Sequence, residues 1–381
     1  MIRRDLLKTT ALAAAAASLL RSAHASTGPA KFDSEIERIN LRHTWTTTMS
    51  SSSYRDTIYT RYTRDGITGH GEGAPIVRYN ESAESGRKAV ESVRDLLTSA
   101  DPWQFEKLMA QVSEQIHGEY AGKAAIDIAL MDWVCQKLGV PIYRYFGLDP
   151  KDTPITTFSI GIDTPEVTRQ KVKEAAAYPI LKVKVGLDSD EATIDAIRSV
   201  TDKPIRVDAN EGWKDREVAV RKIDWLSKKG VEFVEQPMAA DRLDDMRWIK
   251  QRSSLPLIGD ESAQRASDIP KLVGIFDGIN VKLDKAGGIL EAYKEIQIAK
   301  ALGFKTMLGC MVSTSVSVTA AAHLSPLVNY ADLDGNLLIS NDPFTGVLVQ
   351  EGKLILPDRP GLGIEAQRPR ASGAIQTMNS R

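Results

Sequence analysis

The sequence is poor in cysteine and histidine and has no excess of either charge. Cys135 and Cys310 are the only cysteines among 381 residues, too few for a disulfide scaffold, so we expect unpaired thiols. The 49 basic and 50 acidic residues give a net charge of −1, without the basic excess of a nucleic-acid binder or a lysine-rich membrane-binding block. With 42% hydrophobic and 26% charged residues, the composition is that of a folded globular protein.

Residues 1–25 are predicted to be a targeting segment. Arg3 and Arg4 begin a twin-arginine pattern, an apolar run follows at 9–20, and an Ala-His-Ala cleavage site directly precedes Ser26. The apolar run is about a dozen residues long, too short to span a bilayer, and no other segment approaches 18 apolar residues. We therefore expect an exported, periplasmic protein with no stable membrane insertion.

The next part of the chain, residues 26–150, is predicted to be an α+β capping domain. Strand-like segments with a tight turn are followed by segments with apolar residues at helical spacing. The predicted strands are 34–45 and 57–63, and the predicted helices are 81–97 and 121–138.

Residues 151–345 alternate between short apolar runs and helical patterns such as 189–199 and 216–229. Eight strands at this spacing favour a (β/α)8-type TIM barrel, in a modified (β/α)7β form, over an open sheet. No G-x-G-x-x-G sequence follows the early strands, which argues against a dinucleotide-binding fold. Residues 346–381 are predicted to return to the capping domain. The predicted strands are 155–160, 181–185, 205–207, 233–234, 257–258, 278–283, 305–308 and 328–330.

Three acids follow consecutive predicted strands at nearly even spacing. Asp208, Glu235 and Asp260 are separated by 27 and 25 residues, about one strand and one helix. In a (β/α) barrel these positions face one pocket, and carboxylates are the ligands that Mg²⁺ prefers. The alternative is three ordinary strand-end acids that cap the next helices. No histidine lies near any of the three, which argues against zinc.

Lysines occur at the same spacing on either side of the acids. Lys182 and Lys184 share one face of a strand, and repulsion between neighbouring ammonium groups lowers a lysine pKa towards the range of a general base. The alternative is a solvated edge strand. Lys285 lies four units further on, across the barrel, so two bases could face opposite sides of one carbon, as racemisation requires. We expect Lys282, three residues earlier, to be a helper or structural residue that could be mistaken for the base.

The motifs KVK, VDAN, VEQP, GDES and VKLDKAGG, in this order, resemble the enolase superfamily, muconate-lactonising subgroup, over residues 33–366. Enzymes of this superfamily combine a lysine base with Mg²⁺ that stabilises an enediolate. The resemblance implies Mg²⁺ ligation by the three acids. It also implies that Lys184 and Lys285 form the acid/base pair, with Lys182 orienting the substrate carboxylate.

Within this subgroup, Asp332 and Asp334 resemble the D-x-D pair by which dipeptide epimerases hold the α-ammonium of a substrate. The alternative is an Asp-rich turn before Gly335. Cys310 and Met311 would line the pocket, as the corresponding segment does in those enzymes.

Two features depart from the pattern of epimerases for L-Ala-D/L-Glu. The loop at 46–53 lacks the arginine that reads the glutamate side chain, although Arg42 and Arg55 flank it. Ser313 stands where a glutamate is frequent. Both features leave open which residue takes the second place of the dipeptide.

The sequence therefore predicts a Mg²⁺-dependent epimerase that inverts the α-carbon of the C-terminal residue of L-Ala-Xaa dipeptides, with Glu as one candidate for Xaa. A peptidoglycan-derived dipeptide would suit an exported enzyme. The alternatives are N-acylamino acid racemisation, cycloisomerisation or acid-sugar dehydration in the same site, and, outside catalysis, a periplasmic binding protein. The sequence leaves a homo-oligomer and the choice between Mg²⁺ and Mn²⁺ open.

Overall fold

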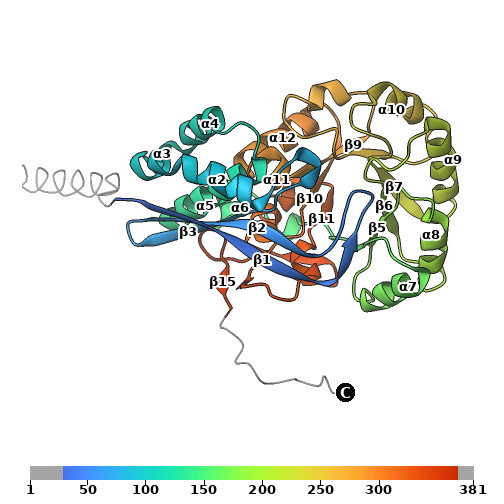
Figure 1. Cartoon of the computed structure of the whole chain (residues 1–381), viewed down its shortest axis with the longest axis horizontal. Helices are drawn as coiled ribbons and strands as arrows, with labels where there is room; N and C mark the ends of the chain where they lie inside the picture. Colours follow the sequence, from blue (N-terminus) through green and yellow to red (C-terminus); the bar gives the residue numbers. More distant parts are fainter. Residues whose placement is uncertain (1–28, 368–381) are drawn as a thin grey trace, which may run out of the picture.

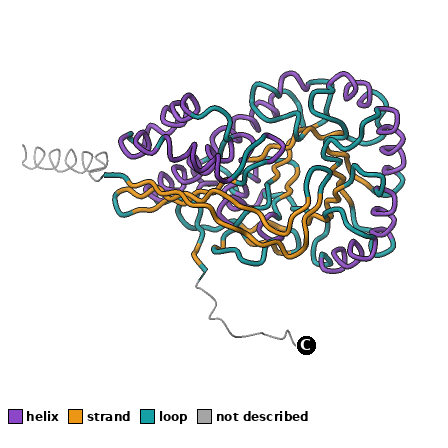
Figure 2. The backbone as a smooth tube through the Cα atoms, viewed as in Figure 1, coloured by secondary structure: helices purple, strands orange, loops and turns teal. Residues whose placement is uncertain are grey.

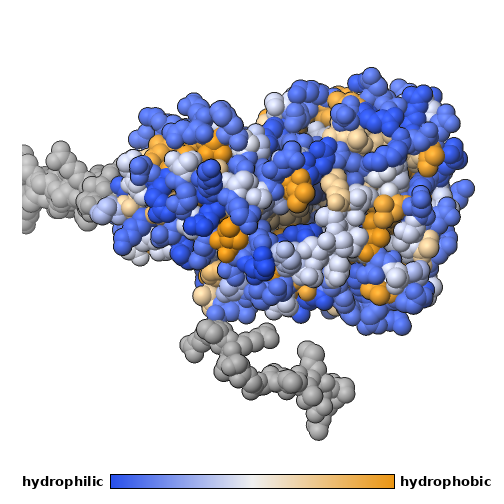
Figure 3. Space-filling view, viewed as in Figure 1, coloured by the Kyte–Doolittle hydropathy of each residue, from blue (hydrophilic) through white to orange (hydrophobic). Residues whose placement is uncertain are grey.

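The computed structural model describes residues 29–367, which form a capping domain beside a barrel (Figure 1). The predicted signal peptide lies outside the described residues. Among residues 29–367, every helix is either too short or too polar to span a bilayer. Figure 3 shows that the face in view is largely hydrophilic, with apolar residues in small separate groups.

An antiparallel sheet and helices form the capping domain. Asp65 and Gly66 join β2 and β3 with positive φ values of 53° and 74°, which a tight hairpin turn favours. The predicted helix at 81–97 is broken in two at Val93, which has φ −105° and ψ 11°. The hairpin of β1 and β2 reaches over the barrel (Figure 2), where Thr48 Oγ1 donates to Asn210 O at 2.8 Å. The elements are β1 (Lys31–Thr46), β2 (Ser51–Arg64), β3 (Ile67–Gly73), α2 (Ala83–Ser92), α3 (Arg94–Ser99), α4 (Phe105–Gln115), α5 (Tyr120–Leu138) and α6 (Ile142–Tyr145).

Eight parallel strands pair in chain order from β4 to β11, and a bridge between Thr156 and Ala331 joins the two ends. The predicted TIM-barrel fold is confirmed, and each of the eight predicted strands overlaps an observed one. The strands are β4 (Phe158–Ile160), β5 (Leu181–Lys184), β6 (Ile205–Asp208), β7 (Val231–Glu235), β8 (Leu257–Gly259), β9 (Gly278–Lys282), β10 (Lys305–Gly309) and β11 (Tyr330–Asp332).

Helices follow every strand from β4 to β7 and also β9 and β10, whereas 3-10 turns follow β8 and β11. The helices are α7 (Pro165–Glu174), α8 (Asp190–Arg198), α9 (Arg216–Ser227), α10 (Leu243–Lys250), α11 (Leu283–Ala286), α12 (Ile289–Ala301) and α13 (Ser315–Ala322), and the turns are η4 (Ile269–Leu272) and η6 (Gly335–Leu338).

The barrel interior changes from apolar to charged towards the carboxyl ends of the strands. The buried side chains of Phe233, Ile258 and Met307 pack together with Tyr330. The Arg206 guanidinium lies over the rings of Phe233 and Tyr330, at 5.4 and 4.9 Å from their centres. This packed layer closes the bottom of the barrel and leaves the charged end as the floor of a pocket.

The C-terminal segment lies against the capping-domain helices. Leu362 N donates to the Asp132 carboxylate of α5 at 2.7 Å, and Ile142 N of α6 donates to Gly361 O at 3.1 Å. Its strands form two short antiparallel pairs: β12 (Phe344–Thr345) with β15 (Glu365–Ala366), and β13 (Leu348–Gln350) with β14 (Lys353–Ile355).

Candidate active site

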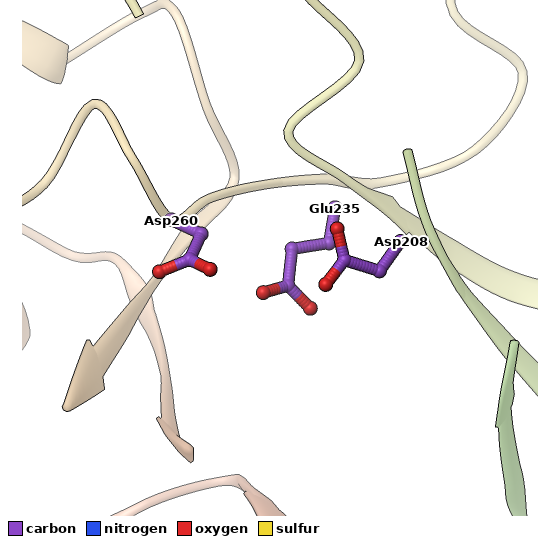
Figure 4. Close-up of side chains that lie close together, drawn as sticks. All are labelled: Asp208, Glu235 and Asp260. Atoms are coloured by element: carbon purple, nitrogen blue, oxygen red, sulfur yellow. The ribbon is translucent and has the colours of Figure 1, made fainter. Parts of the chain in front are cut away.

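Three carboxylates meet at the carboxyl ends of neighbouring strands. Asp208 ends β6, Glu235 ends β7, and Asp260 follows β8. All three are buried, and each offers an oxygen within 4.8 Å of the others (Figure 4). The structure thus brings together the acids that the sequence predicted.

This acidic trio fits a hard divalent cation. The buried Glu235 Oε2 lies 2.8 Å from the Lys182 ammonium but has no hydrogen-bond partner among the described residues. Burial, together with the Asp208 carboxylate, raises the pKa of Glu235 to about 7. A donor set of carboxylate oxygens suits a cation such as Mg²⁺, which would relieve the repulsion between the Glu235 and Asp208 carboxylates.

Lys182 lies at the centre of the acids. Its Nζ is 2.7 Å from Asp332 Oδ2, 2.8 Å from Glu235 Oε2 and 3.2 Å from Asp208 Oδ2. Burial alone would lower the pKa of Lys182, but the surrounding carboxylates, Asp332 first, raise it well above its usual value. The expectation that a neighbouring lysine would lower this pKa is wrong for Lys182, because acids outnumber ammonium groups around it. These three contacts place the Lys182 ammonium as a positive charge among the acids.

Lys184, two residues further along β5, lies at the rim of the acidic trio. Its Nζ donates to Asp208 Oδ2 at 2.7 Å, and its side chain lines the pocket. It is positioned to face a substrate bound above the acids.

The contacts of Lys285 argue against its predicted role as the second acid/base. Its Nζ contacts Asp260 Oδ1 at 2.5 Å and the backbone carbonyls of Asp260, Ala263 and Asn280 at 2.7, 3.0 and 2.8 Å. An ammonium group has three N–H donors, so these acceptors engage it fully. Lys285 also lines the pocket, but these contacts hold it in the turn of α11 as a structural residue.

The geometry favours Lys282 for the second position. Lys282 ends β9, lines the pocket and donates one hydrogen bond, to Asp260 Oδ2 at 2.7 Å. Burial alone would lower the pKa of Lys282, but the Asp260 carboxylate raises it, and a cation bound by the trio would oppose that increase. Since β9 lies four strands from β5 in an eight-stranded barrel, Lys282 and Lys184 approach from opposite sides. The alternation of side chains along β9 could have identified Lys282 from the sequence as a residue that faces the barrel interior. Asn280 shares a face with Lys282, and its Nδ2 donates into the barrel interior to Glu235 Oε1 at 2.8 Å.

Asp332 and Asp334 lie together at the end of β11, and both line the pocket. Asp332 Oδ1 accepts from Thr157 Oγ1 at 2.5 Å, while Asp334 Oδ2 accepts from Ser159 N at 2.6 Å. Burial and the Asp332 carboxylate raise the pKa of Asp334 to about 7. Lys182 pairs with Asp332, whereas Asp334 forms no ion pair among the described residues, so the pair can accept a positively charged group from a substrate.

The pocket above the acids has a volume of about 210 Å³ and is lined by both domains. Residues 74–79 of the capping domain form one wall. Cys310 and Met311, as predicted from the sequence, contribute to the barrel wall beside Asp332. Cys310 Sγ donates to Asp332 O at 3.4 Å. Ser313 is fully buried and donates to Met311 O at 3.2 Å, so it supports this wall from behind.

Of the two flanking arginines, only Arg55 lines the pocket. Its guanidinium donates to Tyr54 O at 3.1 Å and to Ser50 Oγ at 3.5 Å, and burial lowers the pKa of Arg55. Arg42 donates instead to Leu337 O at 3.1 Å, outside the pocket lining.

Sequence reasoning missed two polar pocket residues beside the acids. Asn210 Nδ2 donates to Glu261 Oε1 at 3.2 Å, while Asn210 Oδ1 and Glu261 Oε2 are buried and have no hydrogen-bond partner among the described residues. Their signal was available, because they belong to the VDAN and GDES motifs.

A barrel with a carboxylate trio, two lysines on opposite sides and a capping wall defines a class of enzyme that moves a proton next to a substrate carboxylate. Residues 36–147 match the family model for the mandelate racemase/muconate lactonizing enzyme N-terminal domain, and residues 166–370 match the enolase C-terminal domain-like model. The chain belongs to this family of the enolase superfamily.

Among its relatives, an L-Ala-D/L-Glu epimerase of Bacteroides thetaiotaomicron is 47% identical over 86% of this chain and 85% of its own length. An L-Ala-D/L-amino acid epimerase of Pedosphaera parvula is 44% identical over 86% of this chain and 97% of its own. The dipeptide epimerase of Enterococcus faecalis V583, solved with Mg and L-Leu-L-Tyr, superposes with a TM-score of 0.83 at 33% identity, over 88% of this chain and 99% of that one.

Proposed function

We propose that the protein is a Mg²⁺-dependent dipeptide epimerase that inverts the α-carbon of the C-terminal residue of L-Ala-Xaa dipeptides. The observation that carries the proposal is the placement of Lys184 and Lys282 on opposite sides of the carboxylate trio, with Asp332 and Asp334 at the end of the same pocket. The names of the relatives at 44–47% identity support the same reaction.

The trio of Asp208, Glu235 and Asp260 would hold Mg²⁺, whose charge would stabilise the negative charge that develops on the substrate carboxylate. Lys182 would add a second positive charge beside that carboxylate. In its neutral form, Lys184 or Lys282 removes the α-proton from one face, and the ammonium group of the other donates a proton to the opposite face.

The Asp332 and Asp334 pair binds the α-ammonium of the first residue of the dipeptide. Asp332 is paired with Lys182, but Asp334 is buried without an ion pair among the described residues, and a substrate ammonium would supply one. This contact would fix the distance between the N-terminus of the dipeptide and the reacting carbon.

Proton exchange in heavy water tests the reaction. Incubation of L-Ala-L-Glu with enzyme and Mg²⁺ in D₂O should place deuterium on the α-carbon of the C-terminal residue and yield both epimers, as measured by NMR. The absence of α-deuteration across a set of L-Ala-Xaa dipeptides would refute the proposal.

For the side chain of Xaa, we infer an acidic residue, with glutamate as the first candidate. Arg55 presents a guanidinium in the pocket and forms no ion pair within the described residues. A carboxylate on the substrate side chain is the natural partner for such a group.

We further propose that residues 1–25 are a twin-arginine signal that directs the enzyme to the periplasm, where peptidoglycan-derived dipeptides would be its substrates. The twin arginines, the short apolar run and the Ala-His-Ala site support this assignment. Mass spectrometry of the protein from the periplasmic fraction should find an N-terminus at Ser26; an uncleaved cytoplasmic protein would contradict it.

A further inference from the structure

Two buried carboxylates link the capping domain to the barrel at the end of β3. Glu72, the penultimate residue of β3, accepts hydrogen bonds from Thr314 N at 3.0 Å, Thr314 Oγ1 at 2.6 Å and Ser317 N at 3.2 Å. Thr314 is the N-cap of α13 and lies two residues after the pocket-lining residues 310–312. A capping-domain side chain thus fixes a barrel wall of the pocket.

The second link runs in the opposite direction. Asp284 lies in α11, between Lys282 and Lys285, and its Oδ1 accepts from Ala74 N at 2.7 Å. Ala74 begins the pocket-lining run 74–79. Between the two links, a Cβ added at Gly73 would lie 1.8 Å from Ala121 O, so the backbone is pressed against α5.

Neither carboxylate has a basic partner. Among the described residues, neither Glu72 nor Asp284 forms an ion pair, and both are about 1% exposed. Burying a carboxylate without an ion pair costs free energy of folding, which its hydrogen bonds must offset. Here all of those bonds tie backbone or N-cap groups of one domain to the other.

We propose that Glu72 and Asp284 are positioning residues that set the two walls of the substrate pocket, 74–79 and 310–312, relative to each other. The effects that we predict on KM and kcat rest on the proposed dipeptide epimerase activity. The lysines stand on β5 and β9, which are held by their own strand pairing. Loss of either link should therefore weaken substrate binding more than proton transfer.

The test compares Glu72→Gln and Asp284→Asn with a matched control, Asp132→Asn. Asp132 is equally buried and accepts from His70 N at 2.8 Å and Leu362 N at 2.7 Å, but it holds the C-terminal segment, away from the pocket lining. Asp132→Asn therefore shows how the loss of a buried carboxylate changes the free energy of unfolding without a change at the pocket walls.

With L-Ala-L-Glu as substrate, Glu72→Gln and Asp284→Asn should each raise KM about tenfold, the factor for one hydrogen bond of roughly 1.4 kcal/mol. The kcat should stay within about threefold, and the double variant should raise KM by less than the product of the single effects, because both links hold residues 72–74. Asp132→Asn should leave KM unchanged. An unchanged KM in both test variants would overturn the proposal.

Hydrogen exchange gives a readout that needs no activity. Amides of 74–79 and 310–317 should exchange faster in both test variants than in Asp132→Asn, whether or not the wild type epimerises dipeptides. Equal protection in all three variants would overturn the inference, even with an active enzyme. If Glu72→Gln does not fold, Thr314→Val, which removes one donor to Glu72, should raise KM in the same direction but by less, and an unchanged KM would overturn the proposal.

Discussion

At the scale of single residues, the chemistry depends on how many donors of each lysine are already engaged. Lys285 is saturated by Asp260 and three carbonyl oxygens, whereas Lys282 makes one hydrogen bond and faces the pocket. A general base must reach the proton it removes. Both lysines line the pocket, but Lys282 has one hydrogen bond to break and Lys285 has four acceptors around it, so Lys282 is the better placed of the two.

Replacement of each lysine by methionine should separate their roles. Lys282→Met should lower kcat/KM for epimerisation by roughly 10²- to 10⁴-fold, the usual contribution of a general acid/base. It should also abolish α-deuteration of one epimer in D₂O while the other still exchanges through Lys184. Lys285→Met should retain exchange of both epimers at a reduced rate, because it frees Asp260 and loosens α11. Loss of exchange of one epimer in Lys285→Met, with exchange of both epimers in Lys282→Met, would show that Lys285 is the base.

Arg55 should determine the preference for an acidic side chain. A hydrogen bond between charged groups contributes about 1.5–3 kcal/mol, so Arg55→Met should raise KM for L-Ala-L-Glu about 10- to 100-fold and change KM for L-Ala-L-Leu little. Steady-state kinetics with both dipeptides measures this difference. Arg42→Met is the matched control, since Arg42 binds Leu337 O outside the pocket lining. Equal effects of both variants on both substrates would contradict the assignment.

The acids of the site could be predicted from sequence because each directly follows an apolar strand, so its position is fixed locally. Lys282 and Lys285 were harder to separate. Even spacing from Asp260 points to Lys285, but the strand ends at Lys282 and the chain then turns into α11. The saturation of Lys285 depends on carbonyl groups of Ala263 and Asn280, whose direction no spacing rule gives.

At the scale of elements, strands were located well because apolar runs bounded by turns encode them locally. The contacts between elements could not be predicted in this way. The N-terminus of α12 has Gly288 as its N-cap, with no side chain to accept its amides. Asp127 of α5, more than 160 residues earlier in the chain, accepts from Ile289 N at 2.6 Å instead. Nothing in the local sequence of α12 indicates this distant cap.

Gly288 should therefore tolerate no side chain. It has φ 131°, and a Cβ there would lie 2.4 Å from Asp127, so Gly288→Ala should destabilise the fold by about 3 kcal/mol or more. Gly303→Ala is the control. Its φ of 81° is also positive, but a Cβ meets nothing within 4 Å, so the cost should be about 1 kcal/mol. Urea denaturation compares the two, and equal losses would exclude a role for the Asp127 contact.

At the scale of the whole molecule, the acidic trio makes stability depend on a cation. A ligand that binds only the folded state stabilises it by about 2.7 kcal/mol at a concentration of 100 times its Kd. For a chain of this size we expect Mg²⁺ at that level to raise Tm by about 4 °C, and EDTA to reverse the increase. Differential scanning calorimetry with and without Mg²⁺ measures the shift.

Two variants separate binding at the trio from a general salt effect. Asp208→Asn removes a ligand and should abolish the Tm increase. Lys184→Met removes an ammonium that lies 2.7 Å from Asp208 Oδ2 and competes with a cation for that oxygen. It should therefore bind Mg²⁺ more tightly and show a larger Tm increase, although it cannot transfer protons as the wild type does. The three proteins carry different charges at the trio, so Coulomb interactions should give them different affinities for a cation bound there. Equal Tm shifts in the wild type and both variants would therefore mean that the cation binds elsewhere.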